Sequence, residues 1–329
     1  MLTPRTPAVI LAPMEGLTDA PMRAVQGETG AFTFAVAEFL RISIAVPGKG
    51  AFCRHVPELR AGARTASGLP VQVQLLGGHP GRMAQSAVVA CQAGAQAIDI
   101  NFGCPAPTVN KHDGGATLLK YPRRIREIVE TMRAAVPPEI PVSAKLRLGW
   151  DSIEAIYENA EMAAEGGASW LTIHGRTREQ GYRPPACWKP MRLVRERVGI
   201  PVVANGDIWT VQDFRRCREE TGCDHFMLGR GALANPLLSH QIAGELGLIE
   251  YPQEAASGDG YDWRPLLLRF VECTARCEGE VPRHMVWRLK QWLKIASLYG
   301  TFSAFEAVKR AESVVDIFAI LADEVRPDV

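Results

Sequence analysis

The chain has 329 residues, of which 47% are hydrophobic and 22% charged, with 37 Lys or Arg against 36 Asp or Glu. This composition is typical of a globular protein with a sizeable core and excludes a disordered, collagen-like or coiled-coil chain. No apolar run approaches the roughly 18 residues that a membrane helix needs, and the apolar stretch at 8–12 is too short for a signal peptide. We therefore expect a cytoplasmic protein with no membrane partner.

Eight short apolar runs rich in β-branched residues alternate along the chain with stretches of helical character. Their spacing suits a strand, a loop and a crossover helix, so they predict a (β/α)8 TIM barrel, an α/β fold. The competing fold, a doubly wound open sheet, requires a Gly-rich turn after the first strand, where this chain reads Ala-Pro-Met-Glu-Gly. The expected strands span residues 8–11, 32–39, 71–76, 97–101, 142–146, 170–174, 202–205 and 225–228.

Polar side chains stand at or just after the end of nearly every expected strand. The carboxyl ends of barrel strands meet at one mouth, where barrel enzymes have their active sites. A single residue of this kind is more simply a loop residue or a helix cap, but a set in phase along eight strands indicates a functional site. The set comprises Glu15, Glu38, Gln74, Asn101, Lys145, Arg147, His174, Asn205, Asp207 and Arg230.

Two glycine-containing turns follow the last two strands. The turns 205–207 and 229–231 offer backbone N–H groups free of side chains together with one guanidinium, which predicts a phosphate-binding site. Lys145 and Arg147 lie two residues apart, so both point to the same side of the fifth strand. An imine-forming lysine of the aldolase kind and a cation that stabilises a reduced cofactor ring both fit this arrangement.

Cys104 lies in a glycine turn just past the fourth strand, where its thiol would face the mouth. Without an obvious neighbouring base, it is interpreted as a proton donor rather than an activated nucleophile. The chain contains no Cys-x-x-Cys pair, so the other cysteines are interpreted as buried thiols and no metal site is predicted.

A polar stretch at 251–262 separates the strands from a purely helical remainder, which predicts a barrel domain at 1–250 and a small helical domain at 251–329. Residues 264–310 contain nine Lys or Arg against four Asp or Glu. This charge fits either an ordinary solvated face or a surface for a phosphate backbone. On a helical wheel of 283–298, one face is apolar (Met285, Leu289, Trp292, Ala296) and the other is basic with an indole (Arg283, Trp287, Lys290, Lys294).

Five strings in this order, spread over the whole barrel, resemble the tRNA-dihydrouridine synthases. They are Ala12-Pro13-Met14-Glu15-Gly16, Asp99-Ile100-Asn101-Phe102-Gly103-Cys104-Pro105, Lys145-Leu146-Arg147, His174-Gly175-Arg176-Thr177 and Asn205-Gly206-Asp207, with Gly229-Arg230-Gly231 behind them. Three more strings, at 38–41, 147–151 and 290–293, resemble the bacterial C subfamily.

The resemblance implies a flavin mononucleotide (FMN) at the barrel mouth, reduced by NADPH, and reduction of the 5,6 double bond of a uridine in the tRNA D-loop. For the C subfamily the implied target is uridine 16. It also implies that hydride passes from flavin N5 to C6 of the uracil and that Cys104 supplies the proton at C5, because a thiol of ordinary pKa is protonated at neutral pH.

The resemblance also assigns residues to each ligand. Those implied to bind FMN are Pro13, Met14, Glu15, Gln74, Lys145, His174, Asn205, Gly206, Asp207, Gly229 and Arg230. Asn101 and Arg147 are implied to hydrogen-bond to the edge of the uracil. The residues expected to contact the rest of the tRNA are Arg41, Lys111, Arg283, Arg288 and Lys290.

Three alternatives fit parts of this pattern. Another flavin barrel, of the dihydroorotate dehydrogenase or ene-reductase kind, needs no basic helical domain. An aldolase with Lys145 as the imine predicts a colourless protein. An RNA-binding protein on an inactive barrel should have lost Cys104 or Lys145, and both are present. A monomer is expected.

Overall fold

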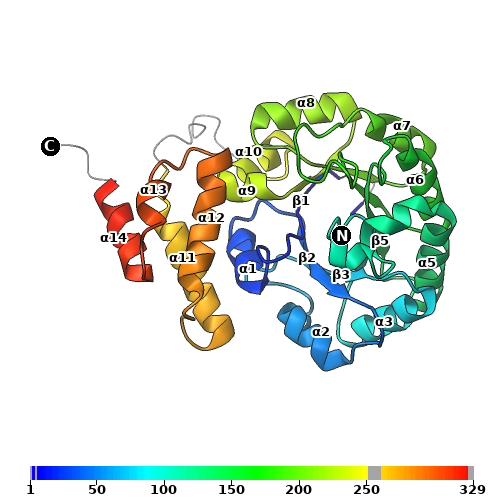
Figure 1. Cartoon of the computed structure of the whole chain (residues 1–329), viewed down its shortest axis with the longest axis horizontal. Coiled ribbons are helices and arrows are strands. Elements are labelled where there is room, and N and C mark those ends of the chain that lie inside the picture. Colours follow the sequence, from blue (N-terminus) through cyan, green and yellow to red (C-terminus); the bar gives the residue numbers. More distant parts are fainter. Residues whose placement is uncertain (1, 4–5, 251–260, 325–329) are drawn as a thin grey trace.

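The computed structural model describes residues 2–3, 6–250 and 261–324. Eight parallel strands form a closed barrel in sequence order (Figure 1), so the predicted TIM barrel is confirmed. All eight expected strands are present, and the second lies two residues later than expected. The strands are β1 (Ala8–Leu11), β2 (Phe34–Arg41), β3 (Val71–Leu76), β4 (Ile98–Asn101), β5 (Val142–Arg147), β6 (Leu171–His174), β7 (Val202–Asn205) and β8 (His225–Leu228).

Alternate residues of β1, β2, β7 and β8 belong to two different cores. Ile10 of β1 packs inside the barrel with Phe34 and Met227, while its neighbours Val9 and Leu11 pack outward in the layer between strands and helices. In β3, β4 and β5 the residues that alternate with this outer layer are polar and buried, among them Gln72, Asp99 and Ser143. They hydrogen-bond to one another inside the barrel.

Helices surround the barrel and follow the strands in turn. The helix α8 has defined caps at both ends: Thr210 and Asp213 form a capping box at its start, and Gly222 follows its last residue in the left-handed conformation. The helices are α1 (Ala20–Glu28), α2 (Lys49–His55), α3 (Pro80–Gln92), α4 (Pro107–Asn110), α5 (Pro122–Ala135), α6 (Ala155–Glu165), α7 (Pro190–Arg197), α8 (Val211–Thr221), α9 (Arg230–Ala234) and α10 (Leu238–Glu245), with 3₁₀ helices η1 (Pro57–Ala61) and η2 (Gly115–Lys120). No helix among the described residues is long and apolar enough to cross a membrane.

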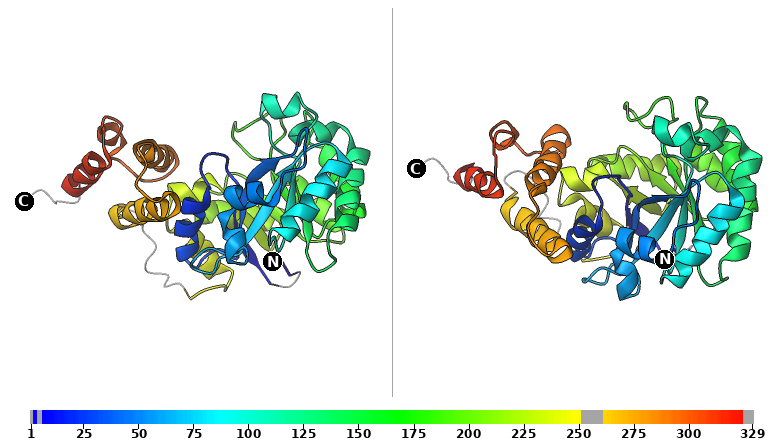
Figure 2. Two further views of the ribbon diagram at one scale, coloured as in Figure 1. Left: turned by 90° about the horizontal axis from the view of Figure 1, so that it is seen from below. Right: turned by 60° about the horizontal axis from the view of Figure 1, so that its bottom comes forward.

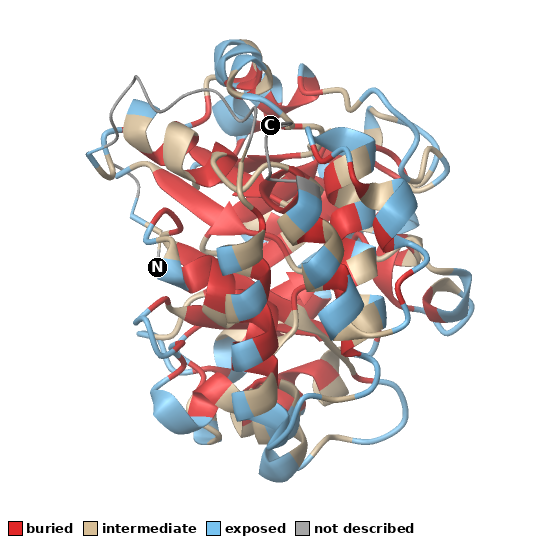
Figure 3. Ribbon diagram, turned by 90° about the vertical axis from the view of Figure 1, so that its left-hand side faces the viewer, coloured by how far each residue is buried: buried red, intermediate tan, exposed pale blue. Residues whose placement is uncertain are grey.

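Four further helices lie together on one side of the barrel (Figures 1 and 2): α11 (Arg264–Glu278), α12 (Met285–Tyr299), α13 (Phe305–Val308) and α14 (Val314–Glu324). The predicted apolar face of α12 is buried, and its hydrophobic cluster also includes Met22 of α1 and Leu233 of α9. Figure 3 faces these helices and shows exposed positions beside buried ones along them. The C-terminal helices thus share a core with the barrel; most of the expected linker at 251–262 lies outside the described residues.

Trp292 links α12 to the barrel, which leads to a stability prediction. Its indole is 1% exposed, and Nε1 donates to the carbonyl oxygen of Leu233 at 2.9 Å. Trp292→Phe keeps an aromatic ring but leaves that carbonyl without its donor, so we expect a loss of about 1–3 kcal/mol in unfolding free energy. Urea titration measures this loss. Trp287→Phe on the same helix, where the ring is 77% exposed, should change stability by less than about 0.5 kcal/mol; equal midpoints for both variants would contradict the prediction.

Candidate active site at the barrel mouth

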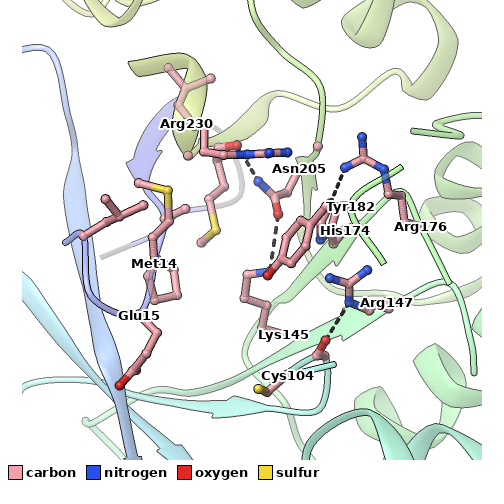
Figure 4. A pocket seen from close by; sticks show the side chains of 18 of the residues that line it. Met14, Glu15, Cys104, Lys145, Arg147, His174, Arg176, Tyr182, Asn205 and Arg230 are labelled. Carbon is pink, nitrogen blue, oxygen red and sulfur yellow. Dashed lines mark hydrogen bonds between the residues drawn. The ribbon is translucent and has the colours of Figure 1, made fainter. Parts of the chain in front are cut away.

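A cavity of about 300 Å³ opens at the carboxyl ends of the strands (Figure 4). Its volume is in the range of small-molecule sites in proteins. Most of the polar residues expected at the mouth line this cavity, together with apolar residues such as Leu17 and Ile208. The predicted residues that line it are Pro13, Met14, Glu15, Glu38, Asn101, Cys104, Lys145, Arg147, His174, Asn205, Gly206, Asp207, Gly229 and Arg230.

The cavity carries positive charge. The ammonium of Lys145 donates to the neutral amide oxygen of Asn205 at 3.3 Å, and burial together with Arg147 lowers the pKa of Lys145 to about 8. On the opposite wall, burial and the nearby Glu15 raise the pKa of Glu38 to about 7, so this carboxyl is partly protonated at neutral pH. An anionic ligand would stabilise the charged form of Lys145, and the site therefore fits an anionic cofactor.

The phosphate-binding turns leave no room for larger residues. Gly206 has φ +113°, and a Cβ there would lie 2.8 Å from Cδ2 of His174. A Cβ on Gly231 would lie 2.1 Å from the carbonyl oxygen of Ile208. Glycine is therefore required at both positions, and it lets a ligand approach the backbone closely. Arg230 begins α9 beside them, so a guanidinium stands next to the glycine turns that were predicted to bind phosphate.

Arg176 fixes two of the predicted cofactor residues. Its guanidinium bonds both carboxylate oxygens of Asp207 at 2.5 Å, and Asp207 also accepts from the N–H of Ala186 at 2.7 Å. The Asp207 carboxylate is thus committed within the protein, and only its backbone faces a ligand. Arg176 Nη1 lies 3.1 Å from His174 Nε2; a guanidinium only donates, so Nε2 accepts and Nδ1 carries the proton. Burial, then Arg147 and other cations, lower the pKa of His174, which is neutral.

The turn that holds Cys104 is fixed by its neighbours. The side-chain oxygen of Asn101 accepts from the backbone N–H groups of Gly103 at 2.9 Å and Cys104 at 2.6 Å. Arg147 Nε donates to the carbonyl oxygen of Gly103 at 2.6 Å. Burial raises the pKa of the Cys104 thiol, which is therefore protonated at neutral pH and suited to donate a proton.

Gln74 is the exception among the strand-end residues. Its side chain is fully buried and does not line the cavity. The amide donates to Asp99 at 2.7 Å and accepts from Asn101 at 2.9 Å. This corrects the expectation that Gln74 faces the mouth, because its amide bonds to Asp99 and Asn101 of β4. It supports Asn101, and through it the Cys104 turn. Its contact with the flavin stays a prediction.

The residues expected to contact tRNA differ in their surroundings: some are exposed, and others are bonded within the protein. Arg41 donates to the carbonyl oxygen of Thr108 in α4, and Lys111 is exposed directly after this helix. Arg283 is exposed just before α12, while Lys290 on α12 donates to the carbonyl oxygen of Lys309 at 2.9 Å. The guanidinium of Arg288 pairs with Asp19 on the barrel and is only 17% exposed, so its tRNA contact stays a prediction. The wheel could not show this pairing, since the two residues are 269 positions apart.

Three aromatic residues at the mouth were not predicted. The Tyr182 ring lies over the middle of the cavity (Figure 4), with the guanidinium carbons of Arg147 and Arg230 at 5.2 and 5.3 Å from its centroid. Trp209 and Tyr299 approach Arg230 from other segments. Each lies outside the strands and the quoted strings, so no local pattern in the sequence marks them.

Sequence comparison decides which family this site belongs to. The family model described as dihydrouridine synthase matches residues 10–256. The chain belongs to this family. The match covers every barrel string on which the resemblance was based, so the predicted family is confirmed.

Curated relatives are similar over nearly the whole chain. A tRNA-dihydrouridine(16) synthase of Pseudomonas putida is 46% identical over 87% of this chain and 86% of its own length. The proteins of the same name from Aquipseudomonas alcaligenes and Neisseria meningitidis serogroup B are 43% and 42% identical, covering 95% and 94% of this chain and 98% and 93% of their own lengths. The alignments thus extend into the C-terminal helices of this family member.

Solved structures share the barrel at much lower identity. Histamine dehydrogenase from Rhizobium sp. 4-9 has a TM-score of 0.56 at 16% identity, covering 73% of this chain and 46% of that one. A 2-naphthoyl-CoA reductase has a TM-score of 0.56 at 12% identity, covering 72% and 50%. These likenesses show the fold of the dihydrouridine synthase barrel and nothing more specific.

Proposed function

We propose that this protein reduces the 5,6 double bond of uridine 16 in tRNA, with FMN as its bound cofactor and NADPH as the reductant. The relatives named tRNA-dihydrouridine(16) synthase support the substrate and its position. The observation that carries the proposal is one cavity that combines a protonated thiol, Cys104, with a cation, Lys145, and a glycine-lined phosphate site. Another flavin barrel would share the phosphate site and Lys145, but it needs no basic helical domain such as the C-terminal helices provide.

The residues present fit FMN. The turns at 205–207 and 229–231, with Arg230, suit the phosphate, and Lys145 supplies positive charge near the opposite end. Bound FMN, once reduced by NADPH, supplies the hydride for C6 of the uracil. Pro13 and Met14 contribute an apolar wall from the loop after β1, which helps to keep water out of the cavity.

The uracil is oriented and protonated by residues of β4 and β5. The Asn101 amide uses one of its hydrogens on Gln74, which leaves the other for a uracil carbonyl. Arg147 is held through Nε and Nη1 by the carbonyl oxygens of Gly103, Thr177 and Gly181, so the two N–H groups on Nη2 have a fixed direction. Cys104 then transfers its proton to C5 as the C–H bond forms at C6. The target base must leave the tRNA stack to enter the cavity, as bases do in other enzymes that modify them.

We further propose that the solvent-facing side of α12 contacts the tRNA backbone. Arg283 and Lys294 are exposed there beside Trp287, and the rim residues Arg41 and Lys111 extend the positive charge toward Cys104. Phosphate neutralisation by Lys or Arg makes affinity fall with salt, and an exposed indole offers a stacking surface for an unpaired base. A monomer remains the expected assembly, which sedimentation would test.

Charge reversal tests this surface. Arg283→Glu should weaken tRNA binding and reduce the slope of log affinity against log salt by about 1, because a phosphate contact is lost. The measurement is a filter-binding or anisotropy titration over a salt series. Arg195→Glu is the matched control, since Arg195 is exposed on α7, away from the C-terminal helices. Equal slopes for the wild type and Arg283→Glu would place the tRNA elsewhere.

The flavin itself is tested by the colour of the purified protein. A flavin absorption spectrum, bleached by NADPH and restored by tRNA that lacks dihydrouridine, is the expected result. A colourless protein in which borohydride traps a carbonyl compound on Lys145 would instead support the aldolase reading.

A further inference from the structure

The guanidinium of Arg230 lies among three aromatic rings at the edge of the cavity. Its carbon is 5.1 Å from the Trp209 centroid, 5.2 Å from Tyr299 and 5.3 Å from Tyr182. Arg230 Nη1 donates to the Tyr299 hydroxyl at 3.4 Å. Trp209 and Tyr299 stack on each other, with centroids 4.2 Å apart and planes inclined by 10°. Two of the rings thus form a paired wall beside Arg230.

This wall joins segments that are far apart in the sequence. Trp209 follows β7, one position after Ile208 of the cavity lining, while Tyr299 is the last residue of α12 among the C-terminal helices. Tyr299 therefore brings the C-terminal helices to the phosphate end of a site that otherwise belongs to the barrel.

The end of α12 is fixed against α9, the short helix that begins with Arg230. Trp292 donates to the carbonyl oxygen of Leu233 in α9. At Gly300 the two helices are so close that a Cβ would lie 2.1 Å from the carbonyl oxygen of Ala234. The position of Tyr299 relative to Arg230 is thus set by contacts to α9 that come before and after Tyr299 in the sequence.

We propose that Tyr299 is a positioning residue of the phosphate site: stacked on Trp209, it holds the Arg230 guanidinium toward the cavity. The C-terminal helices then complete the cofactor site in addition to carrying a tRNA surface. The inference rests on the proposed binding of FMN and adds to it a residue that the barrel itself does not supply.

The physical basis is preorganisation of a flexible side chain. An arginine side chain carries about 2 kcal/mol of rotamer entropy, part of which is lost when it binds a phosphate. Rings that pack on the guanidinium confine it before binding, so less entropy is lost when the ligand arrives. Aromatic packing occupies the faces of the guanidinium and leaves N–H edges free for phosphate oxygens.

The test compares FMN with riboflavin, which has the same ring system without the phosphate. Titration of flavin-free protein, followed by flavin fluorescence, gives both dissociation constants. Tyr299→Ala should weaken FMN binding about 3- to 30-fold, the range expected for a lost cation–π contact, and leave riboflavin binding unchanged. Tyr299→Phe, which keeps the stack, should stay within about 3-fold of the wild type. Leu298→Ala, which truncates the exposed neighbouring residue of α12, should change neither constant.

Arg230→Ala separates failure of this inference from failure of the cofactor site. If Arg230→Ala leaves the preference for FMN over riboflavin intact, the phosphate does not bind there, and both the proposed site and the role of Tyr299 are overturned. If Arg230→Ala removes the preference but Tyr299→Ala preserves it, only the role of Tyr299 is overturned. If Tyr299→Ala weakens the binding of FMN and of riboflavin equally, the role of Tyr299 is also overturned, because the ring would then support the fold and not the phosphate site. Should Tyr299→Ala fail to fold, Trp209→Leu removes the other half of the stack and is expected to give the same selective loss.

Discussion

Cys104→Ala should lower the rate of dihydrouridine formation by about 10²- to 10⁴-fold, the contribution expected of a general acid. The structure supports this role because the thiol lines the cavity, and burial raises its pKa so that it carries a proton at neutral pH. Asn101 and Arg147 hold the surrounding turn through backbone contacts that the substitution does not touch. Single-turnover reduction of tRNA by the NADPH-reduced enzyme measures the effect.

Flavin and tRNA affinity should stay close to wild type in the Cys104→Ala variant, since only the proton donor is removed. Cys277→Ala is the matched control, because Cys277 is exposed on α11 and does not line the cavity. A Cys104→Ala enzyme with full turnover would refute the assigned role. All eight cysteines are free thiols, so neither substitution breaks a disulfide.

Lys145→Met should slow the reduction by about 10²- to 10³-fold, as expected when a fixed charge that stabilises a developing anion is lost. Lys145 supplies positive charge inside the cavity, and burial and Arg147 lower its pKa to about 8 in the flavin-free protein. Bound anionic FMN favours the charged form. As the pH rises through about 8, the flavin-free site loses this charge, and FMN affinity should fall.

The pH dependence of FMN affinity is therefore the specific readout. The wild type should bind FMN more weakly at pH 9 than at pH 7, while Lys145→Met should bind it weakly with a smaller change across this interval. Lys189→Met, at an exposed position before α7, serves as the control and should retain the wild-type profile. A wild-type affinity that does not change across pH 8 would mean that Lys145 does not contact the anion.

Features defined by short stretches of sequence could be predicted well. Strands such as β1, β3, β7 and β8 coincide with their apolar runs because burial on both faces leaves a local signature. The buried face of α12 followed from helical periodicity in the same way. The site residues within the quoted strings were found because the polar side chains follow strand ends, which a closed barrel brings together.

Features that depend on depth or on distant partners could not be predicted. Gln74 has the residue type and the alternation of a mouth residue, but its amide is held by Asp99 and Asn101 of the neighbouring strand β4. Arg288 belongs to a basic segment, yet Asp19 on α1's N-terminus binds it from the other end of the sequence. Tyr299 reaches Arg230 only because α12 packs on α9. The periodicity of a single segment cannot predict contacts between residues that are far apart in the sequence.

The central claim is that one cavity reduces a defined uridine of tRNA, and position-resolved mapping of the product tests it most directly. The purified, flavin-loaded protein is incubated with NADPH and tRNA that lacks dihydrouridine, and reduced uridines are mapped along the chain. We predict dihydrouridine at position 16 alone, with none formed when NADPH is omitted. Absence of dihydrouridine from every position, with a flavin that NADPH reduces normally, would contradict the account.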